Sequence, residues 1–388
     1  MNKKDNNQLT KFQKVELFLN QRYEFRYNII SNDIEQLTKG DKKALYTACN
    51  IDELYRILES HRFSIKIPDI KSLLRSEYVQ IHNPFQTYFE GLKEWNQKTN
   101  HIEQLCTFIN AVEKERFTKH FTKMLVRVVK CALVDEYFNK QCFVLIGRQN
   151  DGKTSFCNWL CPPALKSYYT DNFTDDKDGL IALASNILIN LDELAVKSKI
   201  ELTRLKSVFS KSTVNVRRPY DAKNTIMARR CSFLGSTNEA EFLNDPTGSV
   251  RWLCFQIDGI NWEYSKKVNI DAIWAQAYFL FKHGFQCDLT KEELEENEVM
   301  NRMYTATTPE MEYINKFYEP GNKDNHNVFM QTTELEKDIK NRNGENTKVS
   351  VNALGKALKH LGFIQETKRQ SDKSYPVKGY YIINKIYD

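Results

Sequence analysis

The segment GRQNDGKT, residues 147–154, has the residue types and spacing of a loop that holds the phosphates of a nucleoside triphosphate. Gly147 and Gly152 let backbone N–H groups turn inward around an anion. Lys153 would meet the β- and γ-phosphates, and the Thr154 hydroxyl would bind Mg²⁺. The apolar run CFVLI precedes the loop and the helical stretch SFCNWL follows it, so the pattern has the strand–loop–helix setting that it requires.

Asp151 is an unexpected acid in a loop that should hold a polyanion. Because the phosphate contacts would come from backbone amides and Lys153, the Asp151 side chain can point away. At a subunit edge it would meet an arginine of a neighbour; an Asp151→Ala variant with unchanged ATPase activity and assembly would refute this hypothesis. An alternative for the segment is a tight turn with an exposed lysine. The predicted ATP-binding residues are Gly147, Arg148, Gln149, Asn150, Asp151, Gly152, Lys153, Thr154 and Ser155.

Two acids end a second apolar strand, NILINL, which is followed by Asp192 and Glu193. Asp192 would hold Mg²⁺ through water and Glu193 would polarise the attacking water, as in a Walker B motif. The alternative is a helix whose first turn favours acids. We predict that Lys153, Asp192 and Glu193 are catalytic and that Thr154 and Asp192 bind the metal.

Two further catalytic candidates, Asn238 and Arg251, flank other apolar strands. Asn238 follows CSFLGS, where a polar residue at a strand tip would contact the γ-phosphate or the lytic water. It could instead cap the next helix. Arg251 opens RWLCFQI, and an arginine that reaches a neighbour's nucleotide would stabilise transition-state charge. Arg229 and Arg230 compete for that role, and an ordinary surface arginine is the other interpretation.

The composition is that of a water-soluble protein with one strongly basic segment. Residues 197–230 hold ten Lys/Arg against two acids, a local charge of +8, whereas the 388-residue chain has a net charge of +6. The nine cysteines form no metal-ligand spacing and no disulfide framework, which predicts free thiols in a reducing compartment. No apolar run is long enough to cross a bilayer, and the N-terminus lacks a signal sequence, so a cytoplasmic location without membrane contact is expected.

Hydrophobic periodicity predicts four regions along the chain. Residues 1–115 are expected to form a helical N-terminal domain, in which IDELYRILESHRF is one helix. Residues 116–285 alternate short apolar runs with helical stretches, which indicates an α/β domain with a parallel sheet covered on both faces. Residues 286–320 are predicted as a helical linker. In residues 321–388 two helices and a hairpin follow in the order of a winged helix, with Ser350 capping the second helix and Gly362 ending it.

The string LTRLKSVFSKSTVNVRRPYDAKNTIMARRCSFLGSTNEAEFLNDPTGSVRW closely resembles the virulence-associated protein E family. These proteins are P-loop ATPases of mobile elements, similar to superfamily 3 helicases and poxvirus-type primase-helicases. The resemblance implies an AAA+-like P-loop core in which Asp192 and Glu193 form Walker B, Asn238 is the sensor and Arg251 is the finger. The family commonly has a small residue at position 151 and often a second arginine at position 250, so Asp151 and Val250 are departures.

The resemblance also implies a hairpin between Asp192 and Asn238 that is directed at DNA in the channel of a ring. The basic segment falls there, so basic side chains would neutralise phosphates and an aromatic ring would stack on a base. A solvated basic face, or a site for the acids of a neighbouring subunit, is the alternative. The candidate contacts are Lys206, Lys211, Arg217, Arg218, Tyr220 and Lys223.

The predicted winged helix offers a second DNA-binding surface. Asn352, Lys356 and Lys359 fall on one helical face, and leucines occupy the opposite one. The polar face would enter a major groove, with wing residues touching phosphates. Protein binding is the alternative, as many winged helices bind protein. The wing candidates are Lys368, Arg369 and Lys373.

Together these features predict a Mg²⁺-dependent ATPase that acts as a homo-oligomeric ring, for example a hexamer, and translocates on or unwinds DNA for a mobile element or phage. The alternative is an ATP-gated DNA-binding initiator that assembles without unwinding. A structural module with a degenerate loop is disfavoured by the intact lysine and acids. No primase catalytic constellation is evident, so any priming activity would belong to a separate polypeptide.

Overall fold

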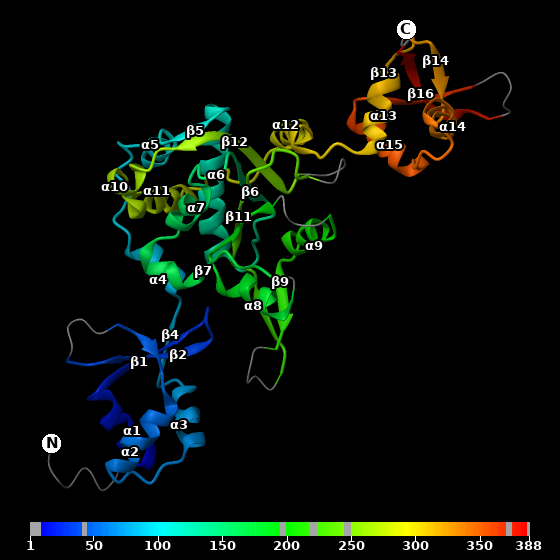
Figure 1. Ribbon diagram of the computed structural model, residues 1–388. Coiled ribbons are helices and arrows are strands. Elements are labelled where there is room, and N and C mark those ends of the chain that lie inside the picture. The colour runs from blue at the N-terminus through cyan, green and yellow to red at the C-terminus, as the bar shows by residue number, and fades with distance from the viewer. Residues whose placement is uncertain are drawn as a thin grey trace.

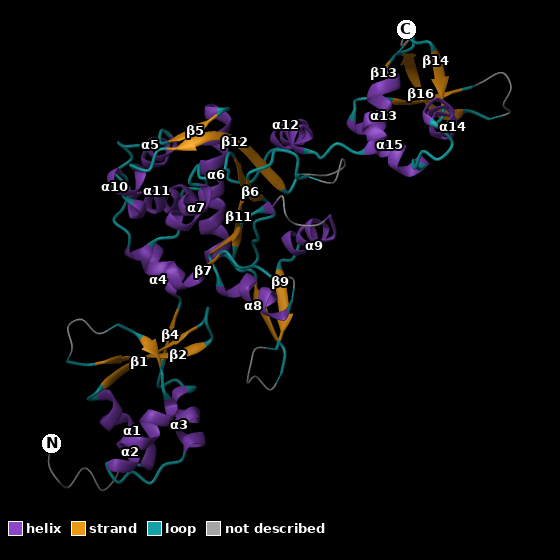
Figure 2. Ribbon diagram, viewed as in Figure 1, coloured by secondary structure: helices purple, strands orange, loops and turns teal. Residues whose placement is uncertain are grey.

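The computed structural model describes residues 9–40, 45–174, 176–194, 199–217, 223–243, 250–369 and 375–385. Figure 1 shows an N-terminal unit, a central body and a C-terminal unit, which follow one another along the chain. Helices and strands occur in all three (Figure 2), so the chain belongs to the mixed α/β class.

The N-terminal unit contains a sheet that the sequence analysis missed. The sheet has the order β3-β2-β1-β4, and the unit's hydrophobic core lies among α1, α2, α3 and β1. The helices predicted for this region are present, but the prediction of a helical domain left out the strands, because they are short or half-exposed and mix polar with apolar residues and so lack a clean period of two. Its elements are α1 (Lys11–Asn20), β1 (Tyr23–Asn28), β2 (Asp33–Thr38), β3 (Thr47–Ala48), α2 (Ile51–Ser60), α3 (Ile67–Leu74) and β4 (Gln80–His82).

The segment after β4 belongs to the central body. Phe85 and Phe89 of α4 (Pro84–Gly91) lie in the same core as Phe143 of the central sheet, together with side chains of α5 (His101–Cys106). The strand β5 (Ile109–Ala111) pairs antiparallel with an edge of that sheet. The domain boundary predicted at residue 115 therefore lies inside the body, because helical periodicity alone does not reveal which core a helix joins.

The central sheet has six strands in the order β5-β12-β6-β11-β8-β7, and every pair except β5–β12 is parallel. All residues of β6, β8 and β11 are buried, as expected for strands covered on both faces. This confirms the predicted parallel sheet. Its remaining strands are β6 (Cys142–Ile146), β7 (Tyr169–Thr170), β8 (Leu188–Leu191), β11 (Ser232–Thr237) and β12 (Trp252–Ile260).

Helices cover the two faces of the sheet. One core contains side chains of α6 (Lys114–Leu133), α7 (Lys153–Leu160) and α11 (Ile270–Lys282). The other contains side chains of α8 (Lys177–Ser185) and α9 (Lys199–Phe209). The hairpin of β9 (Thr213–Val216) and β10 (Thr225–Ala228) follows α9 and extends from the body (Figure 2). Along the chain, α9 and this hairpin lie between β8, which precedes Asp192, and β11, which precedes Asn238.

The predicted linker at residues 286–320 divides between two units. The helix α12 (Lys291–Asn301) packs on the central body, where Glu293 forms ion pairs with Lys119 and Lys123 of α6. The helix α13 (Pro309–Phe317) contributes to the C-terminal core. The predicted helical character is confirmed, but the segment does not form one linker, because α12 has basic partners on the central body that lie far away in the sequence.

The C-terminal unit has the predicted order of two helices and a hairpin, preceded by α13 and two short strands. The Ser350 side chain accepts a hydrogen bond from Ala353 N, and Gly362 has a φ of +85° just after the second helix, so both predicted ends are confirmed. Among the described helices, none has the length and apolar character of a membrane span. The elements are β13 (Tyr318–Pro320), β14 (Val328–Met330), α14 (Thr332–Asn343), α15 (Val351–His360), β15 (Gln365–Lys368) and β16 (Val377–Asn384).

Candidate functional site

The loop between β6 and α7 is built around a buried lysine. Gly152 (φ +84°) and Asn150 (φ +69°) are left-handed, which turns the backbone into the first residue of α7, Lys153. The Lys153 Nζ donates hydrogen bonds to the carbonyl oxygens of Gly147 (2.9 Å) and Arg148 (2.7 Å) and to Asn238 Oδ1 (2.8 Å). The lysine therefore joins its own loop to the tip of β11, as expected for parallel strands whose carboxyl ends share one edge.

The electrostatic environment of this lysine favours an anion. Burial lowers the pKa of Lys153, whereas the carboxylates of Asp151 and Asp192 act in the opposite direction. The helix α7 begins at the same point and adds the partial positive charge of its N-terminus. A phosphate group beside the ammonium would further favour its charged form.

Asp192 collects donors from three segments at the end of β8. The Thr154 Oγ1 donates to Asp192 Oδ1 (3.1 Å) and Oδ2 (3.0 Å), and the Ser236 hydroxyl also donates to Oδ1. The backbone N–H of Glu193 donates to the same Oδ1 at 3.1 Å. Glu193 itself is exposed and has a φ of +51°. The carboxylate is thus held in one orientation, with its oxygens next to the Thr154 hydroxyl at the start of α7.

These residues border one cavity of about 340 Å³. Of the predicted loop residues, Gly147, Arg148 and Asp151 are absent from its described lining, as is Arg251. Sequence reasoning missed the contributions of Ser236, Thr237 and Trp262. The sequence indicates Ser236 and Thr237, because they end an apolar strand, whereas no feature of the sequence indicates Trp262. The described lining residues are Gln149, Asn150, Gly152, Lys153, Thr154, Ser155, Asp192, Glu193, Ser236, Thr237, Asn238 and Trp262.

The side chain of Asp151 is tucked beneath the loop. A Cβ at position 147 would lie 2.9 Å from Asp151 Oδ2 and 2.9 Å from the Ile257 carbonyl oxygen, so only a glycine fits there. The Oδ2 atom is buried and receives no hydrogen bond from the described residues. This position agrees with the interpretation that Asp151 points away from the phosphates, while its contact with a neighbouring subunit stays a prediction.

The three candidate arginines differ in their surroundings. Arg229 is fully buried, and its guanidinium binds carbonyl oxygens that include those of Phe209 and Asn139, both at 2.7 Å. Arg230 forms an ion pair with Asp135 at 2.7 Å. Arg229 therefore cannot reach the nucleotide of a neighbouring subunit and is no longer a candidate for that role. Arg230 is already paired with Asp135.

Arg251 is half-buried, and its Nε donates to the Ser210 hydroxyl at 3.2 Å. Ser210 follows the last residue of α9, and Arg229 binds the carbonyl of that last residue, Phe209. Both arginines thus contact the chain where α9 leads into the hairpin.

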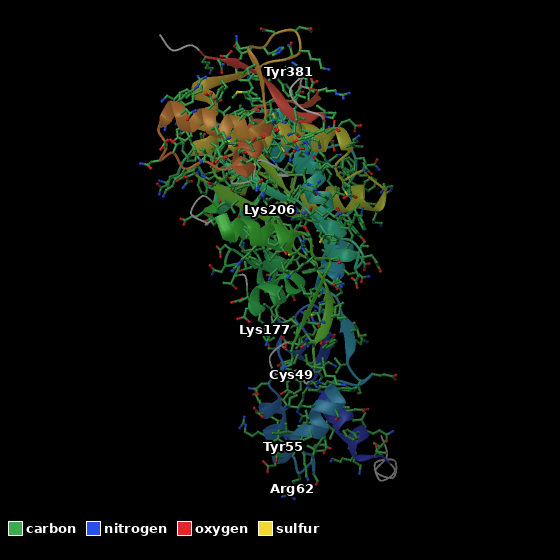
Figure 3. All side chains as sticks on the ribbon, turned by 90° about the vertical axis from the view of Figure 1, so that its right-hand side faces the viewer. Cys49, Tyr55, Arg62, Lys177, Lys206 and Tyr381 are labelled. Carbon is green, nitrogen blue, oxygen red and sulfur yellow. The ribbon has the colours of Figure 1, made fainter. Side chains whose placement is uncertain are left out.

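The basic segment is partly described. Arg217 and Lys223 are exposed at the far ends of β9 and β10. Lys206, in the last turn of α9, and Lys211, between α9 and β9, are half-buried. Arg218 and Tyr220 lie outside the described residues. In Figure 1, α9 lies on the right-hand side of the central body and the hairpin extends downward below it, and Figure 3 shows Lys206 from the right-hand side.

In the C-terminal unit, α15 has the two faces that the sequence predicted. Asn352, Lys356 and Lys359 are exposed, whereas Leu354 and Leu358 are fully buried. Lys368 and Arg369 are also exposed, and the Lys368 ammonium lies 5.4 Å from the ring centre of Tyr381. Lys373 lies outside the part of the chain that the structure describes.

The nine cysteines lie mainly in the interior of the protein. All are free and eight of them are buried. Burial raises the pKa of Cys157, beneath the loop, to about 12, so its thiol stays protonated near neutral pH. No cluster of three or more His, Cys, Asp or Glu side chains with metal-binding geometry occurs among the described residues.

Comparisons with known proteins agree with this architecture. Two solved structures of the apo C-terminal region of NrS-1 match with TM-scores of 0.54 and 0.51, each at 11% identity and over 96% of this chain; they are matched over 99% and 98% of their own lengths. These likenesses describe the fold alone. No curated protein matches the chain. The model of the virulence-associated protein E-like domain matches residues 89–306, more than half of the chain, which therefore belongs to this family.

Proposed function

We propose that the chain is a Mg²⁺-dependent ATPase with an AAA+-like P-loop core that translocates on or unwinds DNA. One observation carries the proposal. Lys153, Asp192 and Asn238, which come from three separate strand ends, border a single cavity at one edge of a parallel sheet. Such an edge is the usual ligand site of open α/β sheets. Because the groups lie far apart in the sequence, their convergence is difficult to explain as ordinary strand termination.

The donor set suits a magnesium triphosphate. The Thr154 hydroxyl and the Asp192 carboxylate lie about a hydrogen bond apart (3.0 Å), and oxygen ligands of this kind are the ones that Mg²⁺ prefers. When bound, the ion would neutralise charge on the β- and γ-phosphates. Lys153 and Asn238 would hold the γ-phosphate, because they already meet across the cavity. The exposed carboxylate of Glu193 would orient the attacking water.

Two described surfaces support DNA as the partner. The hairpin presents Arg217 and Lys223, and α15 presents Lys356 and Lys359 on a unit that we assign as a winged helix. Lysine and arginine of this kind neutralise phosphates without reading sequence. Membership of the family supports a DNA-processing function in replication, and we assign the chain to the replication or excision of a mobile element.

A ring-shaped homo-oligomer would complete the site. Arg251 lies outside the described lining of its own cavity, so it is available to the cavity of an adjacent subunit. Its bond to Ser210 would then link that neighbour's nucleotide to the base of the hairpin. We propose Arg251 as the trans-acting residue on this basis.

The test uses the full chain in ATPase and strand-displacement assays with and without single-stranded DNA. We expect DNA-stimulated hydrolysis, and loss of both activities in Lys153→Ala and Glu193→Gln variants. Lys267→Ala is the matched control, because Lys267 is an exposed lysine that forms an ion pair with the exposed Glu263, and neither residue borders the cavity as described. Stimulated turnover without displacement would identify the initiator alternative, and absence of ATP turnover in the unmodified protein would contradict the proposal.

A further inference from the structure

Trp262 occupies one end of the candidate ATP cavity. It is the one aromatic side chain among the described lining residues, and 52% of it is exposed. A large apolar ring that is half open to a polar cavity gains little from the protein's own core. Its surface is therefore available to a flat ligand.

The strand order places Trp262 opposite the catalytic candidates. Asp192 and Asn238 follow β8 and β11, which lie on one side of β6, whereas Trp262 follows β12 on the other side. The cavity spans both sides across the loop that follows β6. A nucleotide whose γ-phosphate meets Asn238 would extend along this loop and bring its base to the Trp262 end.

The ring also rests against the loop itself. A Cβ at position 152 would lie 2.9 Å from Cζ2 of Trp262, so Gly152 provides both the left-handed turn and the room for the indole. The backbone around the tryptophan is anchored, because Asn261 N donates to the Phe108 carbonyl (2.8 Å) and the Ser265 hydroxyl donates to the Trp262 carbonyl (3.0 Å). The backbone that carries the indole is thus held in place beside the loop.

We propose that Trp262 is the platform on which the nucleobase of the bound triphosphate stacks. This inference rests on the proposed ATPase function and adds to it the group that holds the base. Stacking on an indole is tolerant of base identity, since every base has a π-face. The platform therefore does not select one base, and ATP and GTP should depend on Trp262 to the same degree.

The experiment compares ligands with and without a base, by calorimetry on the full chain with Mg²⁺. The probes are ADP, a non-hydrolysable analogue each of ATP and GTP, and inorganic tripolyphosphate. In Trp262→Ala, affinity for both analogues and for ADP should fall about tenfold, as for loss of one stacked base. Tripolyphosphate affinity should change less than about twofold. Trp262→Phe should recover most of the loss, and Trp95→Ala, which alters a tryptophan outside this cavity, should change nothing.

The outcomes separate the two proposals. Unchanged nucleotide affinity in Trp262→Ala would overturn the stacking role, and so would an equal loss for tripolyphosphate, which would indicate that the ring only supports the loop. In either case the unmodified protein would still bind nucleotide, and the ATPase proposal would stand. If the unmodified protein bound neither nucleotide nor tripolyphosphate, the ATPase proposal and the platform would fail together.

Discussion

The central body contains two groups of buried charge that differ in what surrounds them. The strand-tip cluster consists of Lys153, Thr154, Asp192, Ser236 and Asn238 and borders a cavity. The interhelix cluster consists of Arg116, Lys119, Lys123, Glu293 and Asn297 and lies between α6 and α12. Both are built from residues far apart in the sequence. The strand-tip cluster presents Lys153 and Asp192 to one shared cavity, whereas in the interhelix cluster Glu293 is paired with two lysines, of which Lys119 borders a different cavity. Burial and convergence alone therefore do not identify a functional site.

In the interhelix cluster the carboxylate of Glu293 is neutralised by two lysines. The Glu293 carboxylate oxygens lie 2.8 Å from Lys119 Nζ and 2.7 Å from Lys123 Nζ. The Arg116 guanidinium donates a hydrogen bond to Asn297 Oδ1 at 3.0 Å. Burial alone would raise the pKa of Glu293, but the hydrogen bonds from the two lysines outweigh it and lower the pKa to about 2. The group therefore stays ionised at all ordinary pH values and fastens α12 to the body.

The largest expected effect is on catalysis, through the strand-tip cluster. In an Asp192→Asn variant the amide oxygen can still accept from Thr154 and Ser236, so the fold should persist. Loss of the negative charge should lower ATP turnover by about 10³-fold, roughly 4 kcal/mol of transition-state stabilisation. Steady-state ATPase kinetics and a thermal unfolding midpoint test this. Turnover within tenfold of the unmodified protein would exclude Asp192 as the metal-binding acid.

The next effect is on stability, through the interhelix cluster. Glu293→Gln leaves Lys123, which is 6% exposed, without its counter-charge, and breaking a buried pair in this way costs about 3 kcal/mol. We expect urea unfolding of the central body to shift accordingly while nucleotide affinity stays unchanged. Glu295→Gln on the same helix is the control, because its ion pair with Lys291 is exposed and contributes less than about 1 kcal/mol.

A shift of less than about 1 kcal/mol in Glu293→Gln would mean that the two lysines are satisfied without the acid. Weakened nucleotide binding would mean that α12 positions the cavity, and the distinction between the two clusters would then break down. The unfolding free energy and the nucleotide affinity can be measured on the same samples, because binding is measured at a temperature where both variants are folded.

The parts of the fold that the sequence predicts are those with a strong local signal. Of the fully buried strands, β6 is a continuous apolar run and β8 is apolar apart from Asn190, whereas β11 combines Phe233 and Leu234 with small polar residues. Ser350 and Gly362 mark the ends of α15 by side-chain and backbone chemistry. The half-exposed strands of the N-terminal unit lack such a signal. No local signal shows that α12 and α13 belong to different units either, because this depends on partners far away in the sequence, such as Lys123.

The candidate site divides in the same way. The loop and the paired acids were found because their chemistry requires adjacent residues, as in Asp192 and Glu193. Trp262 was missed because strand order, and not sequence spacing, brings it to the cavity. Arg229 was misjudged for the converse reason. Its sequence neighbours look like an exposed basic segment, yet its guanidinium fills a buried set of carbonyl oxygens.

The smallest expected effect concerns His120, which is fully buried beside the interhelix cluster on α6. Burial lowers the pKa of His120 to about 4; Arg116, Arg127 and Lys119 add to this, and Glu293 opposes it. The unfolded chain, with an ordinary histidine pKa near 6.5, therefore binds more protons between pH 6.5 and pH 4. Stability should rise with pH across this window, and it should be lost as the pH falls toward 4.

His120 should account for about 2 kcal/mol of the stability lost between pH 7 and pH 5. Replacing it by either Leu or Gln removes the titration, so both variants should flatten the pH dependence of urea unfolding by that amount. Glu293 does not interfere, because a pKa lowered to about 2 makes its stabilising contribution complete above pH 4.5 and lost only below it. If both variants kept the slope of the unmodified protein, the proton uptake would belong to another group, and the interhelix cluster would be insensitive to pH in this range.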